Sequence, residues 1–278
     1  MYTREEFEKM RIEAAKEMAE DEELQQDALD VLVKADKHNW IHQTNWFGEP
    51  VLQLPHDLFA LQEIIYKTRP EYIIELGVAW GGSLLFYATL MKMLGGKRVI
   101  GVDIYIPEDL KRRLYSHAEI MPLITLINGS STAPEAIKEI KDIVGNSNKV
   151  MVILDSYHTH EHVLNELRLY SPLVGKGYYL ICGDTIIESI PEQEHRQREW
   201  GHGNNPQTAL LQFLKENDRF AIDKTIENKL LLSCNPNGYL VCVKDNKKLY
   251  KNLREDPLTC LGDESVFSPI SLNTTESI

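Results

Sequence analysis

The sequence predicts an α/β fold built on a doubly wound, mostly parallel sheet of seven strands that ends in an antiparallel hairpin. Five apolar segments between residues 72 and 182 alternate with helical ones, and strict alternation is typical of right-handed βαβ units. These segments are almost continuously hydrophobic, as strands buried on both faces are. Two later apolar segments are separated only by the turn signal "CNPNG", which indicates the hairpin.

An N-terminal helical extension, residues 1–45, is expected to precede the main domain. Residues 3–36 place apolar side chains at mixed intervals of three and four, so they are predicted to form one helix. Its many charges suit a helix that covers a core edge or a subunit interface. The next segment, 39–58, has two tryptophans and two prolines and is expected to be an ordered, non-repetitive loop.

The main domain is expected over residues 46–245. Its predicted strands cover 72–76, 98–103, 123–127, 149–154 and 178–182, and its predicted helices cover 58–69, 81–94, 133–144, 161–173 and 205–217. Asn205 as a cap and Pro206 at the first helical position mark the start of the last helix. The hairpin strands are predicted at 229–233 and 239–244. A parallel sheet that finishes in a hairpin is typical of Rossmann-like class I methyltransferases.

Composition argues against several partners and compartments. The net charge of -12 disfavours nucleic acid or an anionic membrane as the principal partner. The charged start does not resemble a secretory signal, and no apolar run is long enough for membrane insertion. Cys182 and Cys242 lie in apolar segments without CxxC spacing, so a cytoplasmic protein with reduced thiols is predicted. The polar tail, residues 246–278, is expected to be loosely ordered.

The segment "IIELGVAWGGS" predicts a cofactor-binding loop between the first strand of the sheet and the helix after it. Gly77, Gly81 and Gly82 let the backbone approach a ligand, and the helix that starts near Ser83 offers free N–H groups. The spacing differs from the GxGxxG of dinucleotide-binding proteins, and Glu75 would repel a pyrophosphate. A carboxylate at this strand end instead suits the ammonium and sulfonium of S-adenosylmethionine (SAM).

Two further strand ends are predicted to complete the cofactor site. Asp103 ends the second strand and can accept hydrogen bonds from both ribose hydroxyls in either cofactor class. Gly129, Ser130 and Ser131, in "INGSS" after the third strand, are predicted to lie where an adenine would. Each of these could also be an ordinary strand-to-loop residue. The glycine loop, the ribose acid and the hairpin together favour an adenosyl cofactor.

The segment "LDSYHTHEHV" follows the fourth strand and indicates a metal site and a catalytic base. Asp155 and Asp184 follow neighbouring strands, and two carboxylates at adjacent strand ends can bind Mg²⁺. Asp155 is also expected to contact the cofactor. His158 could remove a proton from a hydroxyl as its oxygen attacks the methyl group. A bound cation would lower the pKa of that hydroxyl.

The other two histidines of this segment are interpreted as polar residues at the start of a helix. His160 and His162 are two positions apart, and helical residues at that spacing do not face one ion together. A zinc site is disfavoured because no cysteine lies near in sequence and the available acids prefer harder metals. Neither the spacing nor the predicted fold suits an iron oxygenase.

Six blocks of the chain, in order between Trp46 and Val243, match a family pattern. They are "WFGEPVLQLPHDLFALQEIIYKTRPEYIIELGVAWGGS", "VIGVDI", "INGSS", "LDSYHTHEHVLNELRLYSPLV", "GDT" and "GHGNNPQTALLQFL". Together they resemble the cephalosporin hydroxylase family, whose members look like SAM-dependent O-methyltransferases. The resemblance implies a homo-oligomer that assembles partly through its N-terminal helices. It also implies a SAM pocket lined by Glu75, Gly77, Ser83, Asp103 and Ser130.

A related group, the macrolide sugar O-methyltransferases, is similar in the loop after the fourth strand. Its members use an Asp-x-x-His loop with the aspartate on Mg²⁺ and the histidine as base, which matches Asp155 and His158 here. Those relatives follow the fifth strand with a Glu-Asp pair that also binds the metal. This sequence has Gly183 and Asp184, so one carboxylate ligand is missing.

These features together predict a cytoplasmic SAM-dependent O-methyltransferase that acts on a hydroxyl of a sugar or of a glycosylated small molecule. The polar loop 189–207 could close over this acceptor or could simply be solvated; it holds His195, Arg196, Arg198, Trp200 and His202. One rival function is an NAD-dependent oxidoreductase, which Glu75 and the glycine spacing disfavour. The other is a non-catalytic nucleotide-binding or assembly protein, against which Asp155 and His158 argue.

Overall fold

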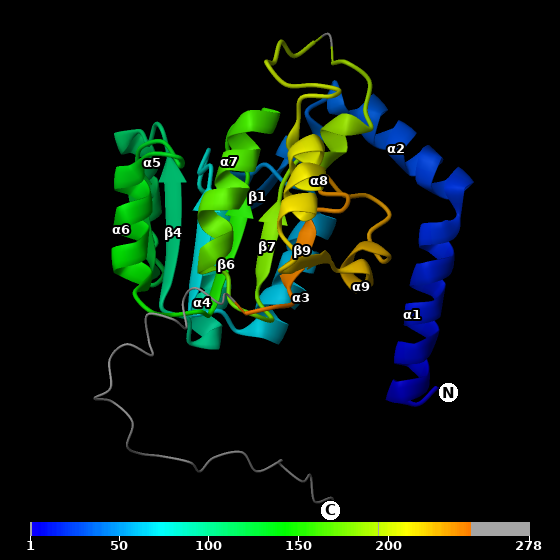
Figure 1. Ribbon diagram of the computed structural model, residues 1–278, viewed down its shortest axis with the longest axis horizontal. Coiled ribbons are helices and arrows are strands. Elements are labelled where there is room, and N and C mark those ends of the chain that lie inside the picture. Colours follow the sequence, from blue (N-terminus) through cyan, green and yellow to red (C-terminus); the bar gives the residue numbers. More distant parts are fainter. Residues whose placement is uncertain (1, 194, 246–278) are drawn as a thin grey trace, which may run out of the picture. The chain divides into compact units, whose positions relative to one another are not determined.

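The computed structural model describes residues 2–193 and 195–245, and Figure 1 shows how their helices and strands are arranged. The central sheet has the strand order β5-β4-β3-β6-β7-β9-β8. The strands are β3 (Tyr72–Leu76), β4 (Arg98–Asp103), β5 (Ile124–Asn128), β6 (Val150–Leu154), β7 (Tyr179–Cys182), β8 (Phe220–Ile222) and β9 (Tyr239–Cys242). Pairing is parallel from β5 to β7, and β9 runs antiparallel to both of its neighbours. The predicted fold class is confirmed.

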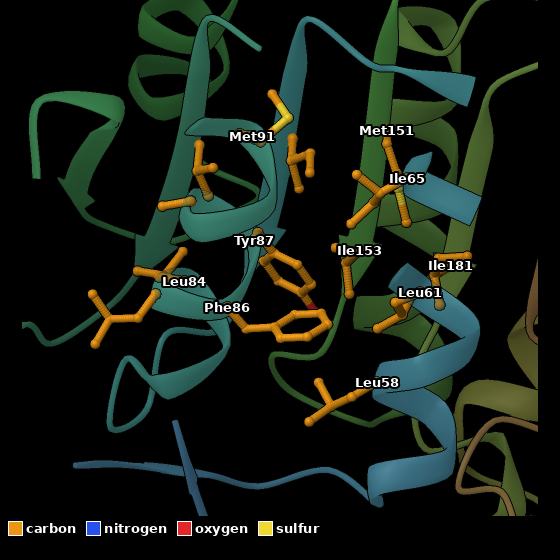
Figure 2. Packing of buried hydrophobic residues seen from close by; sticks show 14 of the residues in the cluster. Leu58, Leu61, Ile65, Leu84, Phe86, Tyr87, Met91, Met151, Ile153 and Ile181 are labelled. Atoms are coloured by element: carbon orange, nitrogen blue, oxygen red, sulfur yellow. The ribbon is translucent and has the colours of Figure 1, made fainter. Parts of the chain in front are cut away.

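Helices cover both faces of this sheet. One face carries α3 (Pro55–Thr68), α4 (Gly82–Leu94) and α5 (Glu108–Tyr115), and the other carries α6 (Pro134–Val144), α7 (His160–Tyr170) and α8 (Pro206–Glu216). Adjacent residues of β3 therefore enter different cores, Ile73 the first and Ile74 the second. Figure 2 shows the first core, in which Leu61 of α3 and Tyr87 of α4 point toward Ile153 of β6.

The N-terminal region differs from the prediction in two places. It forms two helices, α1 (Arg4–Glu20) and α2 (Glu22–Asp36), because the Asp21 side chain accepts a hydrogen bond from the backbone N–H of Leu24 at 3.0 Å and caps α2. No residue of α1 is buried in the described structure. The expected loop contains a small hairpin instead, β1 (Thr44–Trp46) and β2 (Glu49–Val51). Phe47 and Gly48 both have positive φ, as a tight two-residue turn requires.

The last two strands of the sheet pair antiparallel as predicted, but the first of them is not the predicted segment 229–233. The partner of β9 is β8, which precedes the helix α9 (Lys224–Glu227), and residues 229–233 are not in the sheet. The buried carboxylate of Asp57 on α3 explains this difference. It accepts hydrogen bonds from Oγ of Ser233 at 2.6 Å and from the backbone N–H of Cys234 at 2.9 Å. These contacts hold the apolar segment against α3, away from a sheet edge.

The remaining elements are short. They are the 3-10 helices η1 (Trp40–His42), η2 (Met121–Leu123), η3 (Ser171–Leu173) and η4 (Thr185–Glu188). The predicted cap of α8 is present, since the Asn205 side chain accepts a hydrogen bond from the N–H of Thr208, whereas α5 was not predicted. Cys182, Cys234 and Cys242 are free and buried. None of the described helices is both long and apolar enough to cross a membrane. The predicted polar tail lies outside the described residues.

We expect Asp57→Ala to lower the free energy of unfolding by about 3 to 5 kcal/mol, because buried donors lose their acceptor. A third donor is the hydroxyl of Tyr239, which is 2.7 Å from Oδ1 of Asp57. Urea denaturation measures the change. The matched control is Asp109→Ala on α5, an exposed carboxylate paired with Arg113, which should leave the midpoint nearly unchanged. Equal midpoints for the two variants would contradict this account of Asp57.

Candidate active site

Three polar side chains meet where strands β6 and β7 end. Asp155 and His158 follow β6, Asp184 follows β7, and the two strands pair in parallel up to Leu154 and Cys182. One ligand atom from each of the three side chains lies within 4.8 Å of the others. Nε2 of His158 is 3.5 Å from Oδ2 of Asp184. Two carboxylates and an imidazole at this spacing could hold a divalent cation.

The Asp155 carboxyl lies beside a second acid, which makes its charged form costly. Burial and then the charge of Asp184 raise the pKa of Asp155 to about 6, while His158 opposes the rise. Oδ2 of Asp155 accepts a hydrogen bond from Nε2 of Gln53 at 3.3 Å. A cation between the two carboxylates would relieve their repulsion, so the donor set fits Mg²⁺.

The backbone at positions 183 and 184 accounts for the glycine found where the resemblance suggests a glutamate. A Cβ on Gly183 would lie 2.7 Å from the carbonyl oxygen of Leu154 and 3.3 Å from Oδ1 of Asp155, so a side chain there requires the backbone to shift. Asp184 has φ +52°, and its N–H donates to Oδ1 of Asn235 at 2.9 Å. This contact fixes Asp184 in a conformation that aspartate tolerates better than most residues.

The glycine loop after β3 packs directly on the backbone of Asp155. Gly77 has φ +99°, and a Cβ there would lie 2.0 Å from the Asp155 carbonyl oxygen. Gly81 caps α4 in the left-handed conformation. A Cβ on Gly82 would lie 2.3 Å from the carbonyl oxygen of Pro50 in the β1–β2 hairpin. The predicted cofactor loop and the acidic cluster are therefore in direct contact.

Glu75, one residue before the end of β3, is a buried carboxyl with an unused oxygen. Its side chain is 1% exposed, and Oε2 has no hydrogen-bond partner among the described residues. Burial raises the pKa of Glu75 well above its ordinary value, and the hydroxyl of Ser83 opposes this rise. Oε2 of Glu75 could accept from the cationic group of SAM, and that contact stays a prediction.

Asp103 uses its carboxylate to hold the glycine loop. Oδ2 accepts hydrogen bonds from the N–H groups of Val78 at 2.8 Å and Ala79 at 3.3 Å. The N–H of Gly129, beside Ser130, donates to the carbonyl oxygen of Asp103 at 2.8 Å. The loops after β3, β4 and β5 are thus tied together at one edge of the sheet. Ribose and adenine contacts by these residues stay predictions.

A cavity of about 260 Å³ opens beside these groups. Of the predicted site residues, the structure brings five to its lining: Gly77, Ser83, Asp155, His158 and Asp184. The others lie outside the lining: Glu75, Gly81, Gly82, Asp103, Gly129 and Ser130.

Part of the cavity wall comes from two segments outside the sheet, and the sequence associated only one of them, the polar loop 189–207, with the acceptor. From α2 and the region of η1 it receives Leu32, Val33, Asp36, Trp40, Ile41 and His42. From the polar loop 189–207 it receives Arg196, Arg198 and Trp200, whereas His195 binds Asp36 and His202 binds Glu188. Trp40 and Trp200, each in a polar segment, are the sequence features that could have indicated this part of the wall.

The two histidines interpreted as helix-start residues lie outside the acidic cluster. The ring of His160 is hydrogen-bonded to Thr208 at 2.8 Å and to Gln212 at 3.1 Å, so it joins α7 to α8. Nε2 of His162 is 3.1 Å from Oε1 of the buried Glu166. The two rings therefore have separate polar partners.

The mostly parallel sheet with its antiparallel end, together with the site at the carboxyl ends of its strands, defines a class of enzymes, the SAM-dependent methyltransferases. The family model described as Rhamnosyl O-methyltransferase/CmcI matches residues 38–243. The chain belongs to this family. The resemblance to the cephalosporin hydroxylase family is thereby confirmed.

Known relatives and solved structures agree with this assignment. A rhamnosyl O-methyltransferase of Mycobacterium bovis (strain BCG / Pasteur 1173P2) is 29% identical over 219 residues, which cover 75% of this chain and 84% of that protein. One of Mycobacterium leprae (strain TN) is 29% identical over 218 residues, 75% of this chain and 90% of that protein. A CmcI structure named for its Mg and SAM has a TM-score of 0.51 at 22% identity, over 73% of this chain and 78% of that one.

We expect Gly77→Ala to lower kcat/KM by about a hundredfold, because a displaced loop misplaces the reacting groups. The added Cβ meets the Asp155 backbone, and the left-handed φ adds strain. The control is Gly95→Ala at the end of α4, where φ is +76° but nothing lies within 4 Å of a Cβ. Steady-state kinetics measures both variants. If Gly95→Ala lost as much activity, backbone strain alone would be responsible.

Proposed function

We propose that this protein transfers a methyl group from SAM to a hydroxyl of a sugar-containing small molecule, with His158 as the general base and Mg²⁺ on Asp155 and Asp184. The observation that carries the proposal is the cluster of these three side chains, with their ligand atoms within 4.8 Å, beside the glycine loop and on the cavity wall. One rhamnosyl O-methyltransferase relative and the CmcI structure with Mg and SAM support the same chemistry.

His158 is placed to act on a ligand in the cavity. Its side chain is 12% exposed, and its ring packs edge-on against Trp200 with centroids 5.1 Å apart. Oδ2 of Asp184 lies 3.5 Å from Nε2 of this ring. These contacts hold the ring in one orientation, as a general base requires.

The proposed reaction is a methyl transfer from a sulfonium to a hydroxyl oxygen. Bound SAM supplies an electrophilic methyl group on a sulfonium, and bound Mg²⁺ supplies positive charge that favours the alkoxide form of a nearby hydroxyl. His158 takes the hydroxyl proton while the oxygen forms the new bond to the methyl carbon. The carbon–sulfur bond breaks, its electron pair stays on sulfur, and the products are a methyl ether and S-adenosylhomocysteine. Asp155 and Asp184 would hold the cation, and the cavity wall would orient the acceptor.

The first experiment is titration calorimetry of the full chain with SAM and with NAD, each with and without Mg²⁺, followed by an assay for S-adenosylhomocysteine with rhamnoside acceptors. The proposal expects SAM to bind, NAD to be inert and turnover to depend on Mg²⁺. NAD binding without SAM binding would favour the oxidoreductase alternative. Tight SAM binding without turnover on any glycoside would favour the non-catalytic alternative.

A further inference from the structure

The cavity wall opposite the strand ends contains two arginines, Arg196 and Arg198. Arg196 has partners within the protein. One of its terminal nitrogens is 2.8 Å from Oδ1 of Asp36 and donates to Oδ1 of Asn39 at 3.0 Å. Its side chain is 15% exposed. This arginine is therefore a structural link between the polar loop and the end of α2.

Arg198 is in a different position. Among the described residues no hydrogen bond or ion pair involves its guanidinium, which lies 5.6 Å from the centre of the Trp200 ring. Burial and then the neighbouring charge of Arg196 lower the pKa of Arg198 from its ordinary value, while the charges of Asp184 and Asp36 oppose the fall. A partly buried guanidinium beside a second cation is costly unless an anion meets it.

The acids nearby already have partners. Oδ2 of Asp36 accepts from Gln193 at 2.5 Å and lies 2.8 Å from Nε2 of His195, in addition to its pair with Arg196. Asp155 and Asp184 are the proposed cation ligands. His42, on the same wall, has a lowered pKa, mainly because of burial and then because of the charge of Arg196. Arg198 therefore has no hydrogen-bonded anion among the described residues, and an anionic ligand could supply one.

Trp200 connects this cation to the proposed base. Its ring lies under the Arg198 guanidinium and packs edge-on against His158 at 5.1 Å. The indole Nε1 is buried without a hydrogen-bond partner in the described structure. A molecule whose hydroxyl reaches His158 can thus place a second polar group beside Trp200 and Arg198. A guanidinium without a hydrogen-bond partner suits an acceptor oxygen that carries negative charge.

We infer that the methyl acceptor is an anionic sugar, and that its carboxylate or phosphate binds Arg198 on the cavity wall while a ring hydroxyl faces His158. This inference rests on the proposed function and narrows its substrate class from sugars in general to sugar acids or sugar phosphates. Arg198 is a binding residue in this account and takes no part in the proton transfer.

The test is titration calorimetry on the full chain with Mg²⁺ and S-adenosylhomocysteine, using three probes: methyl glucuronide, glucose 1-phosphate and methyl rhamnoside. The first two carry a carboxylate and a phosphate, and the third is neutral. We expect an anionic probe to bind more tightly than the neutral one, and Arg198→Gln to weaken it by about ten- to a hundredfold. The probe that shows this loss identifies the anion. Arg198→Lys should lose less, because it keeps the charge.

The control is Arg112→Gln, which removes the same charge from an exposed position on α5 outside the cavity lining and should leave all affinities unchanged. Equal affinity for neutral and anionic probes, or no loss in Arg198→Gln, would overturn the inference. SAM affinity is measured on the same variants. A loss of SAM affinity in Arg198→Gln would overturn it too, since the arginine would then serve the carboxylate of the cofactor. Arg198-dependent anion binding in a chain that never turns over would uphold the anion site and refute the methyl transfer.

Discussion

Replacing His158 with glutamine should lower kcat by about 10²- to 10⁴-fold, the usual contribution of a general base, and leave SAM affinity nearly unchanged. Glutamine approximates the size and polarity of the imidazole but cannot take the hydroxyl proton. The ring is held by Trp200 at 5.1 Å and by Asp184 at 3.5 Å, so the substitution changes the chemistry more than the shape of the wall. Formation of S-adenosylhomocysteine measures the rate, and calorimetry measures the affinity.

The sequence supplies a matched control two residues further along. His160→Gln removes a ring that is hydrogen-bonded to Thr208 and Gln212 and that lies outside the acidic cluster. This variant should keep kcat within a few-fold of the wild type, with a lower melting temperature as its main effect. Wild-type turnover by His158→Gln would rule out this histidine as the base.

Removing either carboxylate of the cluster should abolish functional Mg²⁺ binding. We expect Asp155→Ala and Asp184→Ala each to weaken Mg²⁺ by about a hundredfold or more, because even the outer partners of metal ligands are worth about 10- to 100-fold. The effect is large here because Asp155 and Asp184 are the only carboxylates of the described cluster. Calorimetric titration with Mg²⁺ measures the affinity, and turnover at saturating SAM should fall in parallel.

A control variant at a surface carboxylate distinguishes the loss of Mg²⁺ binding from a general loss of negative charge. Asp142→Ala on α6 removes a carboxylate that is 66% exposed and pairs with Lys138, and it should leave Mg²⁺ affinity unchanged. If the wild type itself turned over equally well with Mg²⁺ and with a chelator, the metal part of the proposal would be wrong. His158 would then act with Asp184 alone.

The sequence was informative where local pattern and chain topology determine the structure. The strands from β3 to β7 are continuous apolar runs, and parallel pairing places their carboxyl ends at one edge. Asp155, His158 and Asp184 could therefore be brought together before any coordinates were known. Gly77 was predicted for the same reason, although its contact with the Asp155 backbone has no sequence signature.

The errors arose where tertiary contacts overrule the local pattern. Residues 229–233 look like a strand, but hydrogen bonds from Ser233 and Cys234 to the buried Asp57 hold that segment on α3. The cap at Asp21 was hidden in a run of charges, so two helices were predicted as one. The cavity wall from α2 depends on the pair between Asp36 and Arg196, which are too far apart in sequence for any periodicity to reveal.

That pair has a consequence for how the family can diversify. Asp36 and Arg196 join two segments that lie outside the sheet. These segments supply much of the cavity lining. The proposed base and cation ligands, in contrast, follow strands of the sheet. If the proposed function is correct, substitutions in this part of the lining should change acceptor preference without displacing the proposed base and cation ligands. Acceptor preference can therefore change, by natural variation or by design, nearly independently of the methyl-transfer step, provided that the ion pair between α2 and the polar loop is kept.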